Sequence, residues 1–363
     1  MGILASWTNH HLRGGSLRAD STYQEELMTS TIDKKTLDAP LKRVLGGGSV
    51  AIWVATVALF LVSPVIAPGS LGGPAVLGML PFAAVLAIAG VGQTLVVQQR
   101  GLDLSVPGMM AFGAALVSGL PQNNGWPLGL AIVAAIVLPA AAGLVNGILV
   151  TRFGVMPLVA TLGMNAVLLG TVFGLSNGTP AGAMQPLADF ATSKSIGVPN
   201  ALIVAILVVA LIGFVTQRSI IGRRLTAVGV SEKAASVLGI GVGLYQIVAY
   251  AFAGALYGVA AILYTGYVTT PPLFFGDAYL LPTVAAVVLG GTALTGGRAA
   301  IVASGVAALF LTQLAQLLRA VGLPEAMQLL IQAGVLIIVV LLREIVPRIS
   351  AALARRRLSP APA

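Results

Sequence analysis

Long uncharged segments, made mostly of apolar residues, separate the few charged residues of this sequence. Only 9% of the 363 residues are charged and 57% are hydrophobic, whereas a soluble domain usually carries about 25% charged residues. A charged side chain is costly at the centre of a bilayer, so long uncharged segments locate membrane spans. The pattern therefore predicts an all-α, polytopic transmembrane helix bundle.

The uncharged segments have room for about ten spans. The two longest, residues 44–99 and 104–151, are each divided by a proline- and glycine-rich break, and six shorter segments hold one span each. The third span follows Asp103 directly and is either a full crossing or a broken, re-entrant helix. The expected spans are 50–67, 75–98, 104–120, 127–150, 155–175, 200–217, 244–267, 279–295, 299–318 and 327–342.

The basic residues orient these spans. With the N-terminus in the cytoplasm and ten crossings, all of the 20 Lys and Arg residues except Lys194 and Arg319 fall on the inner side, as the positive-inside rule requires. We therefore expect a multi-pass protein of the cell (inner) membrane with both termini cytoplasmic. Residues 1–48 form a polar tail expected to be disordered, residues 49–343 the transmembrane domain with a cytoplasmic loop near 218–242, and residues 344–363 a basic tail.

Several functional classes are excluded by residues that the chain lacks. It has no cysteine, and its two histidines, His10 and His11, lie in the N-terminal tail. We therefore expect no catalytic residues, no metal site and no cofactor in this chain. A Gly-x-x-x-x-Gly-Lys-[Ser/Thr] phosphate-binding loop is also missing, so the chain is not an ATPase of that class. The net charge of +9 reflects membrane topology and does not indicate a nucleic-acid partner.

Uncharged polar residues lie inside the expected spans. They either hydrogen-bond between helices or line a wet path for a polar, uncharged solute, and they argue against an ion-coupled carrier, which usually places charges at mid-membrane. Tyr250, Tyr257 and Tyr264 repeat every seven residues and so form one stripe, which either packs on a neighbour or offers an aromatic face suited to a sugar. The candidate path residues are Gln93, Asn146, Thr161, Asn165, Tyr250 and Tyr257.

The loop between the sixth and seventh spans, residues 218–242, contains a short amphipathic helix. Ser231 is a suitable N-cap, Glu232 favours the positive end of the helix dipole, and Gly239 can end the helix. An apolar face is expected from Ala234, Ala235, Val237 and Leu238. A helix this short needs a surface to pack on, which is either the membrane interface or a cytoplasmic partner.

Four stretches resemble the ribose-type (monosaccharide) permeases of ATP-binding cassette (ABC) importers, and they occur in the same order. They are residues 101–106 (GLDLSV), residues 143–147 (GLVNG) followed by 157–163 (PLVATLG), the loop GRRLTAVGVSEKAASVLGIGV, and residues 285–297 (AAVVLGGTALTGG). The similarity covers residues 50–343. The chain departs from the family at three places. Arg100 and Pro107 each stand where the family commonly has glycine, and Leu281-Pro282-Thr283 stands where Leu-Asp-Ala is common.

The resemblance implies a permease subunit without its own ATPase site. It implies a separate cytoplasmic ATPase subunit that binds ATP and Mg, an extracytoplasmic solute-binding protein, and a second permease, identical or paralogous, across a dimer interface in the lipid. The implied ATPase-coupling residues are Gly229, Ser231, Glu232, Lys233, Ala234, Ala235, Leu238 and Gly239. The implied structural-motif residues are Asp103, Ser105, Gly290, Gly291, Gly296 and Gly297.

The solute stays open at this stage. A neutral hydroxylated solute, a monosaccharide or polyol, fits the uncharged spans. Related permeases carry autoinducer-like sugars, nucleosides or branched-chain amino acids, and an ATP-independent channel or carrier is a further alternative.

Overall fold

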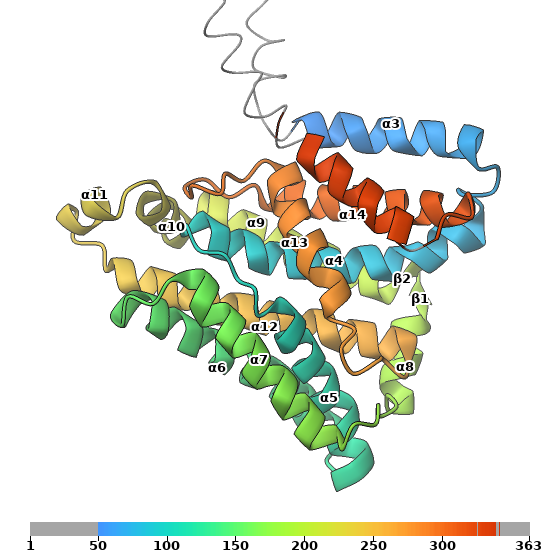
Figure 1. Cartoon of the computed structure of the whole chain (residues 1–363), viewed down its shortest axis with the longest axis horizontal. Coiled ribbons are helices and arrows are strands. Elements are labelled where there is room, and N and C mark those ends of the chain that lie inside the picture. The colour runs from blue at the N-terminus through green and yellow to red at the C-terminus, as the bar shows by residue number, and fades with distance from the viewer. Residues whose placement is uncertain (1–49, 325, 339–340, 342–363) are drawn as a thin grey trace, which may run out of the picture. The chain divides into compact units, whose positions relative to one another are not determined.

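The computed structural model describes residues 50–324, 326–338 and 341, and within them the chain is almost entirely helical (Figure 1). The expected tails 1–48 and 344–363 lie outside the described residues. Two short strands, β1 (Lys194–Ser195) and β2 (Val198–Pro199), pair antiparallel. The helices are α3 (Val50–Ile66), α4 (Gly73–Gln98), α5 (Val106–Asn124), α6 (Leu128–Arg152), α7 (Pro157–Ser176), α8 (Gln185–Thr192), α9 (Asn200–Arg218), α10 (Ile220–Val230), α11 (Glu232–Val237), α12 (Val242–Val268), α13 (Asp277–Gly290), α14 (Ile301–Ala320) and the helix Ala326–Ile338.

Six of the described helices are long and apolar enough to cross a bilayer: α4, α6, α7, α9, α12 and α14. Helices α3, α13 and Ala326–Ile338 are apolar but shorter. Each of the ten expected spans coincides with a described helix, although the ends differ. The largest difference is in the eighth span, expected at 279–295, because α13 already ends at Gly290, where Gly291 takes a left-handed conformation with φ +103°.

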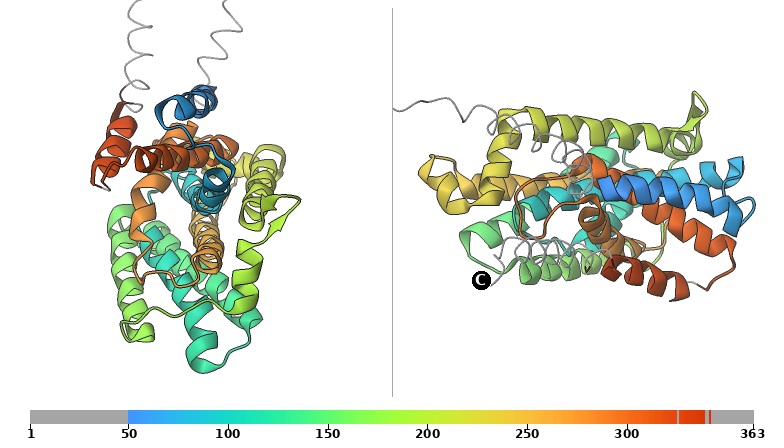
Figure 2. Two further views of the ribbon diagram at one scale, coloured as in Figure 1. Left: turned by 90° about the vertical axis from the view of Figure 1, so that its right-hand side faces the viewer. Right: turned by 90° about the horizontal axis from the view of Figure 1, so that it is seen from above.

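Helices α4 and α12 lie at the centre of the bundle. In the left view of Figure 2 both are seen nearly end-on, inside a ring of other helices. Most residues of α4 from Met79 to Gln98 are buried, and α12 packs against α4, α5 and α6. The outer helices leave apolar side chains exposed, among them Leu61, Val159 and Leu211, as expected for a surface that faces lipid.

Glycines bring α6 and α12 into backbone contact. A methyl group added at Gly254 would overlap the carbonyl oxygen of Pro139, and one added at Gly258 would overlap that of Ala135. In the same way, a Cβ added at Gly147 would lie 2.7 Å from the Cα of Ile247. The hydrophobic effect does not drive association between helices in lipid. Close approach of this kind stabilises the helix pair instead, through van der Waals packing of the two backbones.

Three short elements were not expected from the sequence. The region after the fifth span contains α8 and the β1–β2 hairpin, and α10 precedes the expected short helix of the cytoplasmic loop. Ser219 caps α10 by accepting a hydrogen bond from the backbone N–H of Gly222 at 3.1 Å. These elements are half-polar and short, so hydropathy alone does not reveal them.

Replacing Gly258 with alanine is expected to destabilise the bundle by about 1–3 kcal/mol, because the added methyl group forces α6 and α12 apart. Gly174→Ala is the matched control, since an added Cβ there meets no atom within 4 Å. Thermal unfolding in detergent, followed by the loss of the monodisperse peak, measures both. Equal melting temperatures for the two variants would contradict this account of the α6–α12 contact.

Candidate functional site

The chain between α4 and α5 is buried but not helical. After Gln98 the helix ends in a turn in which the N–H of Gly101 donates to the carbonyl oxygen of Val96 at 3.1 Å. Residues 101–105 then pass between the helices as irregular chain, and α5 begins at Val106 (Figure 1). We call residues 101–105 the inserted segment. Its backbone groups need hydrogen-bond partners, because buried and unpaired peptide groups are costly.

Asp103 and Ser105 stabilise the inserted segment from within. Both are fully buried, and one carboxylate oxygen of Asp103, Oδ1, accepts hydrogen bonds from the backbone N–H of Ser105 at 2.9 Å and from its hydroxyl group. Asn146 of α6 donates from Nδ2 to the Ser105 hydroxyl oxygen at 3.0 Å. The aspartate therefore folds the segment into a tight turn that α6 holds in place.

Gln93 of α4 binds the backbone of Asp103 from the other side. With the amide oriented so that both of its ends are satisfied, Nε2 donates to the Asp103 carbonyl at 3.2 Å and Oε1 accepts from the Asp103 N–H at 3.3 Å. The same nitrogen lies 3.0 Å from the hydroxyl oxygen of Tyr257 on α12. The side chain thus replaces, for this residue, the backbone partners that a helix would provide.

The other candidate path residues also surround this region. The Thr161 hydroxyl of α7 donates to the Pro157 carbonyl of its own helix at 2.8 Å and lies 3.4 Å from the Leu102 carbonyl, and Asn165 Oδ1 accepts from the backbone N–H of Gly108 at 2.7 Å. Tyr250 of α12 leaves Gly101 no room for a side chain. All six candidates therefore converge on the inserted segment and the start of α5. Gln93, Asn146, Thr161, Tyr250 and Tyr257 are fully buried here, and their contact with a solute stays a prediction.

The C-terminal end of α4 is bonded to α10. Gln98 Nε2 donates to the Thr226 hydroxyl at 3.2 Å, and Gln99 Nε2 donates to the Leu225 carbonyl at 3.0 Å. Arg100 donates from Nε to the Gly229 carbonyl at 2.9 Å and from Nη2 to the Val230 carbonyl. These carbonyls end α10, where the helix dipole is negative and a guanidinium is favourable. We call this group of contacts the α4–α10 junction.

The glycine-rich stretch after α13 completes the junction. The backbone N–H of Gly297 donates to the Gln98 carbonyl at 3.0 Å, and a methyl group added at Gly229 would overlap that same oxygen. Gly296 has φ +83° and lies against Arg100 and the Gly229 carbonyl. Gly290 lies against the backbone of Ser304, where an added Cβ would be 2.6 Å from the nitrogen, and Gly291 ends α13. The motif glycines thus allow three backbone segments to meet.

Helix α11 projects from this junction. The expected cap is confirmed, since the Ser231 hydroxyl accepts from the Ala234 N–H at 3.3 Å, and the chain leaves the helix at Gly239 with φ +73°. The apolar face expected from Ala234, Ala235, Val237 and Leu238 stays a prediction. Within this chain Ala235 is buried, whereas Val237 is 86% exposed and Leu238 75% exposed. Glu232, Lys233 and Ala234 are also exposed.

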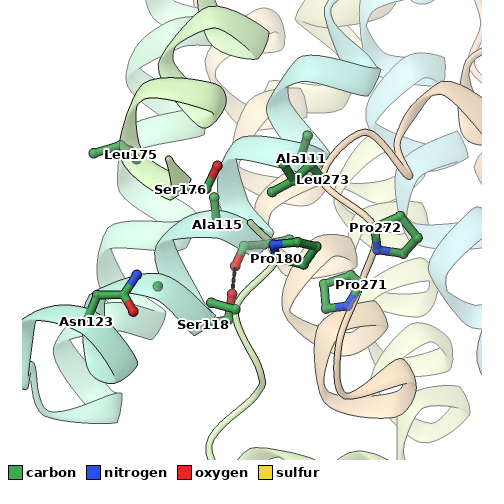
Figure 3. Close-up of a pocket in the computed structure, with 13 residues that line it drawn as sticks. Ala111, Ala115, Ser118, Asn123, Leu175, Ser176, Pro180, Pro271, Pro272 and Leu273 are labelled. Carbon is green, nitrogen blue, oxygen red and sulfur yellow. Dashed lines mark hydrogen bonds between the residues drawn. The ribbon is translucent and has the colours of Figure 1, made fainter. Parts of the chain in front are cut away.

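Figure 3 shows a small cavity between α5, the chain after α7 and residues 271–273. Its volume of about 20 Å³ leaves room for about one water molecule. It is therefore too small for a sugar. Within the described residues no three His, Cys, Asp or Glu side chains gather in a way that could hold a metal ion.

Comparison with known proteins assigns the chain to a family. Residues 75–340 match the family described as "Branched-chain amino acid transport system / permease component". The chain belongs to this permease family. No solved structure matches it.

Known relatives of the permease span most of its length. The ribose import permease protein RbsC of Bacillus subtilis is 31% identical over 287 residues, which cover 78% of this chain and 89% of that protein. The fructose import permease protein FruF of Bifidobacterium longum is 31% identical over 297 residues, covering 80% and 83%. The autoinducer 2 import system permease protein LsrD of Salmonella typhi is 31% identical over 267 residues, covering 72% and 80%. The permease is therefore a multi-pass membrane transport subunit.

Sequence reasoning did not identify the contacts that bond α4 to α10. It places Gln98 and Gln99 among the polar residues that either bond between helices or line a path, without naming their partners, and Thr226 in the loop expected at 218–242. A signal was nevertheless present, because Arg100 stands where the resembling family commonly has glycine. Its φ of +64° is a left-handed conformation that costs a non-glycine residue roughly 1–2 kcal/mol. The permease keeps an arginine there, and its side chain makes the two bonds described above.

Arg100→Ala is expected to destabilise the permease more than Arg100→Gly. Both variants lose charge-assisted hydrogen bonds, each worth about 1.5–3 kcal/mol, but only glycine also relieves the left-handed backbone. Thermal unfolding in detergent measures the difference, with Arg152→Ala as a control whose side chain makes no hydrogen bond in the described structure. If Arg100→Ala melts with the wild type, the bonds to α10 contribute nothing.

Proposed function

We propose that this chain is the permease subunit of an ATP-driven importer and that it carries a monosaccharide. The single observation that supports this most is its similarity, over most of its length, to import permeases for ribose, fructose and autoinducer 2. The uncharged polar residues inside the expected spans agree with a neutral hydroxylated solute. The chain itself would bind no cofactor, and ATP and Mg would be bound by the partner ATPase.

We further propose ten crossings with both termini in the cytoplasm. The ten helices that coincide with the expected spans, and the charge pattern that leaves only Lys194 and Arg319 outside, support this topology. The α10–α11 end of the bundle would then face the cytoplasm, and the β1–β2 hairpin would face the opposite side.

In this proposal the ATPase subunit docks on α11. Val237 and Leu238 are apolar and exposed at its tip, and Glu232 and Lys233 lie exposed beside them. An exposed apolar pair with charged neighbours is typical of a surface that a partner covers. Docking would give the short helix the packing that it lacks alone.

The α4–α10 junction would transmit the movement of the ATPase. Ala235 anchors α11 to the bundle, and Arg100 bonds the preceding turn of α10 to the chain that leads into the inserted segment. When ATP closes the ATPase dimer, α10, α11 and the end of α4 would move as one body. The inserted segment and α5 would follow, which opens the path between two permease copies or paralogues to one side of the membrane. The solute would arrive from an extracytoplasmic binding protein.

A branched-chain amino acid is the second candidate solute, because the family description names that class. Such a solute is a zwitterion, and the six candidate path residues contain no charged group. Competition of labelled ribose uptake by leucine or by fructose separates the two candidates.

Single cysteines test the proposed topology cleanly, because the chain has none of its own. Ser236→Cys on α11 and Ser195→Cys on β1 are both exposed. An impermeant maleimide added outside intact cells is expected to label Ser195→Cys only, and both after the membrane is opened. Labelling of Ser236→Cys in intact cells would overturn the orientation.

Variants of α11 test docking and energy coupling together. Leu238→Asp and Ala235→Trp are expected to lower co-purification of the ATPase and ATP-dependent uptake by at least tenfold, while membrane insertion is kept, since the first places a carboxylate in the contact and the second displaces the helix. Thr179→Asp, at an exposed position in the loop after α7, is the control.

Uptake of labelled ribose or fructose into vesicles with the ATPase and binding protein gives the readout for these variants. Sugar uptake by the wild type that continues without hydrolysable ATP would overturn the proposed function. Wild-type behaviour of both α11 variants would overturn docking at α11 alone.

A further inference from the structure

A cavity of about 270 Å³ lies among α4, α12, α13, α14 and the helix Ala326–Ile338. Its lining includes Phe82, Tyr264, Tyr279, Thr312, Arg319 and Gln332. We call it the aromatic cavity. None of the six path residues expected from the sequence lines it.

The aromatic rings of the cavity are fixed in place by their neighbours. Tyr264 stacks on Phe275 with ring centroids 4.0 Å apart and planes 5° apart. Tyr279 meets Tyr264 edge to face at 5.9 Å, and Phe82 does so at 6.1 Å. Such packing leaves the rings little freedom, so they present rigid apolar surfaces at little entropic cost on binding.

Polar groups complement these surfaces. In the described part of the chain, neither the Gln332 amide nor the Tyr264 hydroxyl takes part in a hydrogen bond within the protein. Gln328, by contrast, already donates to the Leu323 carbonyl at 2.8 Å. An amide, a hydroxyl and the Arg319 guanidinium beside fixed rings, with no carboxylate in the lining, provide hydrogen-bonding groups that suit a ligand with an apolar face and several hydroxyl groups.

The cavity lies toward the end of the bundle away from the α4–α10 junction. Phe82 is in the first half of α4, which ends at the junction, and Tyr264 is near the end of α12, which begins after α11. Tyr279 is in the first turn of α13 and Arg319 in the last turn of α14. In the proposed topology this is the extracytoplasmic side, where a solute is delivered.

The other cavities are less suited to a sugar. The cavity in Figure 3 holds about 20 Å³. A cavity of about 450 Å³ at the start of α4 has one aromatic residue, Tyr267, whereas the aromatic cavity has three. A third, of about 210 Å³, lies at the junction end and is lined by Arg223 and Arg298, which suit an anion.

We propose that the aromatic cavity binds the transported monosaccharide, with the Tyr264 and Tyr279 rings against the face of the sugar and Gln332 bonded to its hydroxyl groups. This inference rests on the proposed function. It places the first solute contact in the half of the bundle opposite the inserted segment, so that the solute would meet the buried Gln93 and Tyr257 region only after the bundle opens.

Cysteine protection tests the cavity without altering its polar groups. Ala315→Cys puts the only thiol of the chain in the cavity wall, and Ser195→Cys is the exposed control. With the complete importer in vesicles and D-ribose or D-fructose as the probe, whichever the wild type takes up, saturating sugar is expected to slow thiol labelling at Ala315→Cys at least fivefold. Labelling at Ser195→Cys is expected to stay unchanged.

Transport kinetics provide a second measurement. Gln332→Leu is expected to raise the sugar concentration for half-maximal uptake about tenfold, as the loss of one hydrogen bond predicts, with little change in the maximal rate. Gln316→Leu is the matched control, because Gln316 donates to the Ser70 carbonyl at 2.8 Å and does not line the cavity.

The outcomes separate the two proposals. Suppose that the wild type imports sugar with ATP, that sugar does not slow thiol labelling at Ala315→Cys, and that Gln332→Leu does not raise the sugar concentration for half-maximal uptake. The cavity is then not the solute site, and the importer proposal stands. Protection by decanol and not by sugar would identify a lipid chain as the occupant and overturn the inference. If the wild type imports neither sugar with ATP, the proposed function fails and this inference fails with it.

Discussion

The inserted segment, residues 101–105, imposes the central constraint on this bundle. A non-helical backbone inside an apolar protein loses the hydrogen bonds that a helix makes within itself, and each unpaired group is costly. Side chains from other helices replace them: Gln93 binds Asp103, Asn146 binds Ser105, and the Thr161 hydroxyl lies 3.4 Å from the Leu102 carbonyl. Because these side chains come from α4, α6 and α7, the segment also fixes where those helices lie.

The same segment is continuous with the α4–α10 junction. Arg100 is one residue before it, and its guanidinium holds the carbonyl groups of Gly229 and Val230 next to α11. Gly296 and Gly297 allow a third backbone to approach, with positive φ angles that other residues adopt only under strain. A displacement of α10 and α11 therefore has a direct mechanical connection to the start of α5. One of the few charges of the chain, the Arg100 guanidinium, therefore lies where a movement of α10 and α11 would be passed to the membrane domain.

Helix positions were predictable because they depend on the charge and hydropathy of each chain segment by itself, and not on contacts between segments. The uncharged stretches located a helix at each of the ten expected places, and Ser231 and Gly239 were identified as a cap and a stop from local chemistry alone. The expected end of the eighth span was wrong because hydropathy continues past Gly291 whereas the helix does not. The helices α8 and α10 are too short and too polar for the same reasoning to find.

The partners of polar residues could not be predicted, because they depend on tertiary contacts. Gln93, Asn146 and Thr161 were identified as polar residues in spans, but the sequence contains nothing that assigns them to one common segment. Arg100 was noted as a departure, and its function follows only from the position of α10. The orientation of Val237 and Leu238 away from the bundle likewise depends on which face of α11 Ala235 occupies. Tyr264 was part of a predicted stripe, yet its cavity is formed by residues far apart in the chain, such as Phe82 and Gln332, which are about 250 positions from each other.

Hydrogen–deuterium exchange of the wild-type permease in lipid discs tests the central claim most directly. The account predicts that peptides covering residues 101–108 exchange as slowly as the buried half of α4, because the N–H groups of Asp103, Ser105 and Gly108 are bonded to the side chains of Gln93, Asp103 and Asn165. Exchange of these residues as fast as that of the exposed loop at residues 177–184 would contradict it.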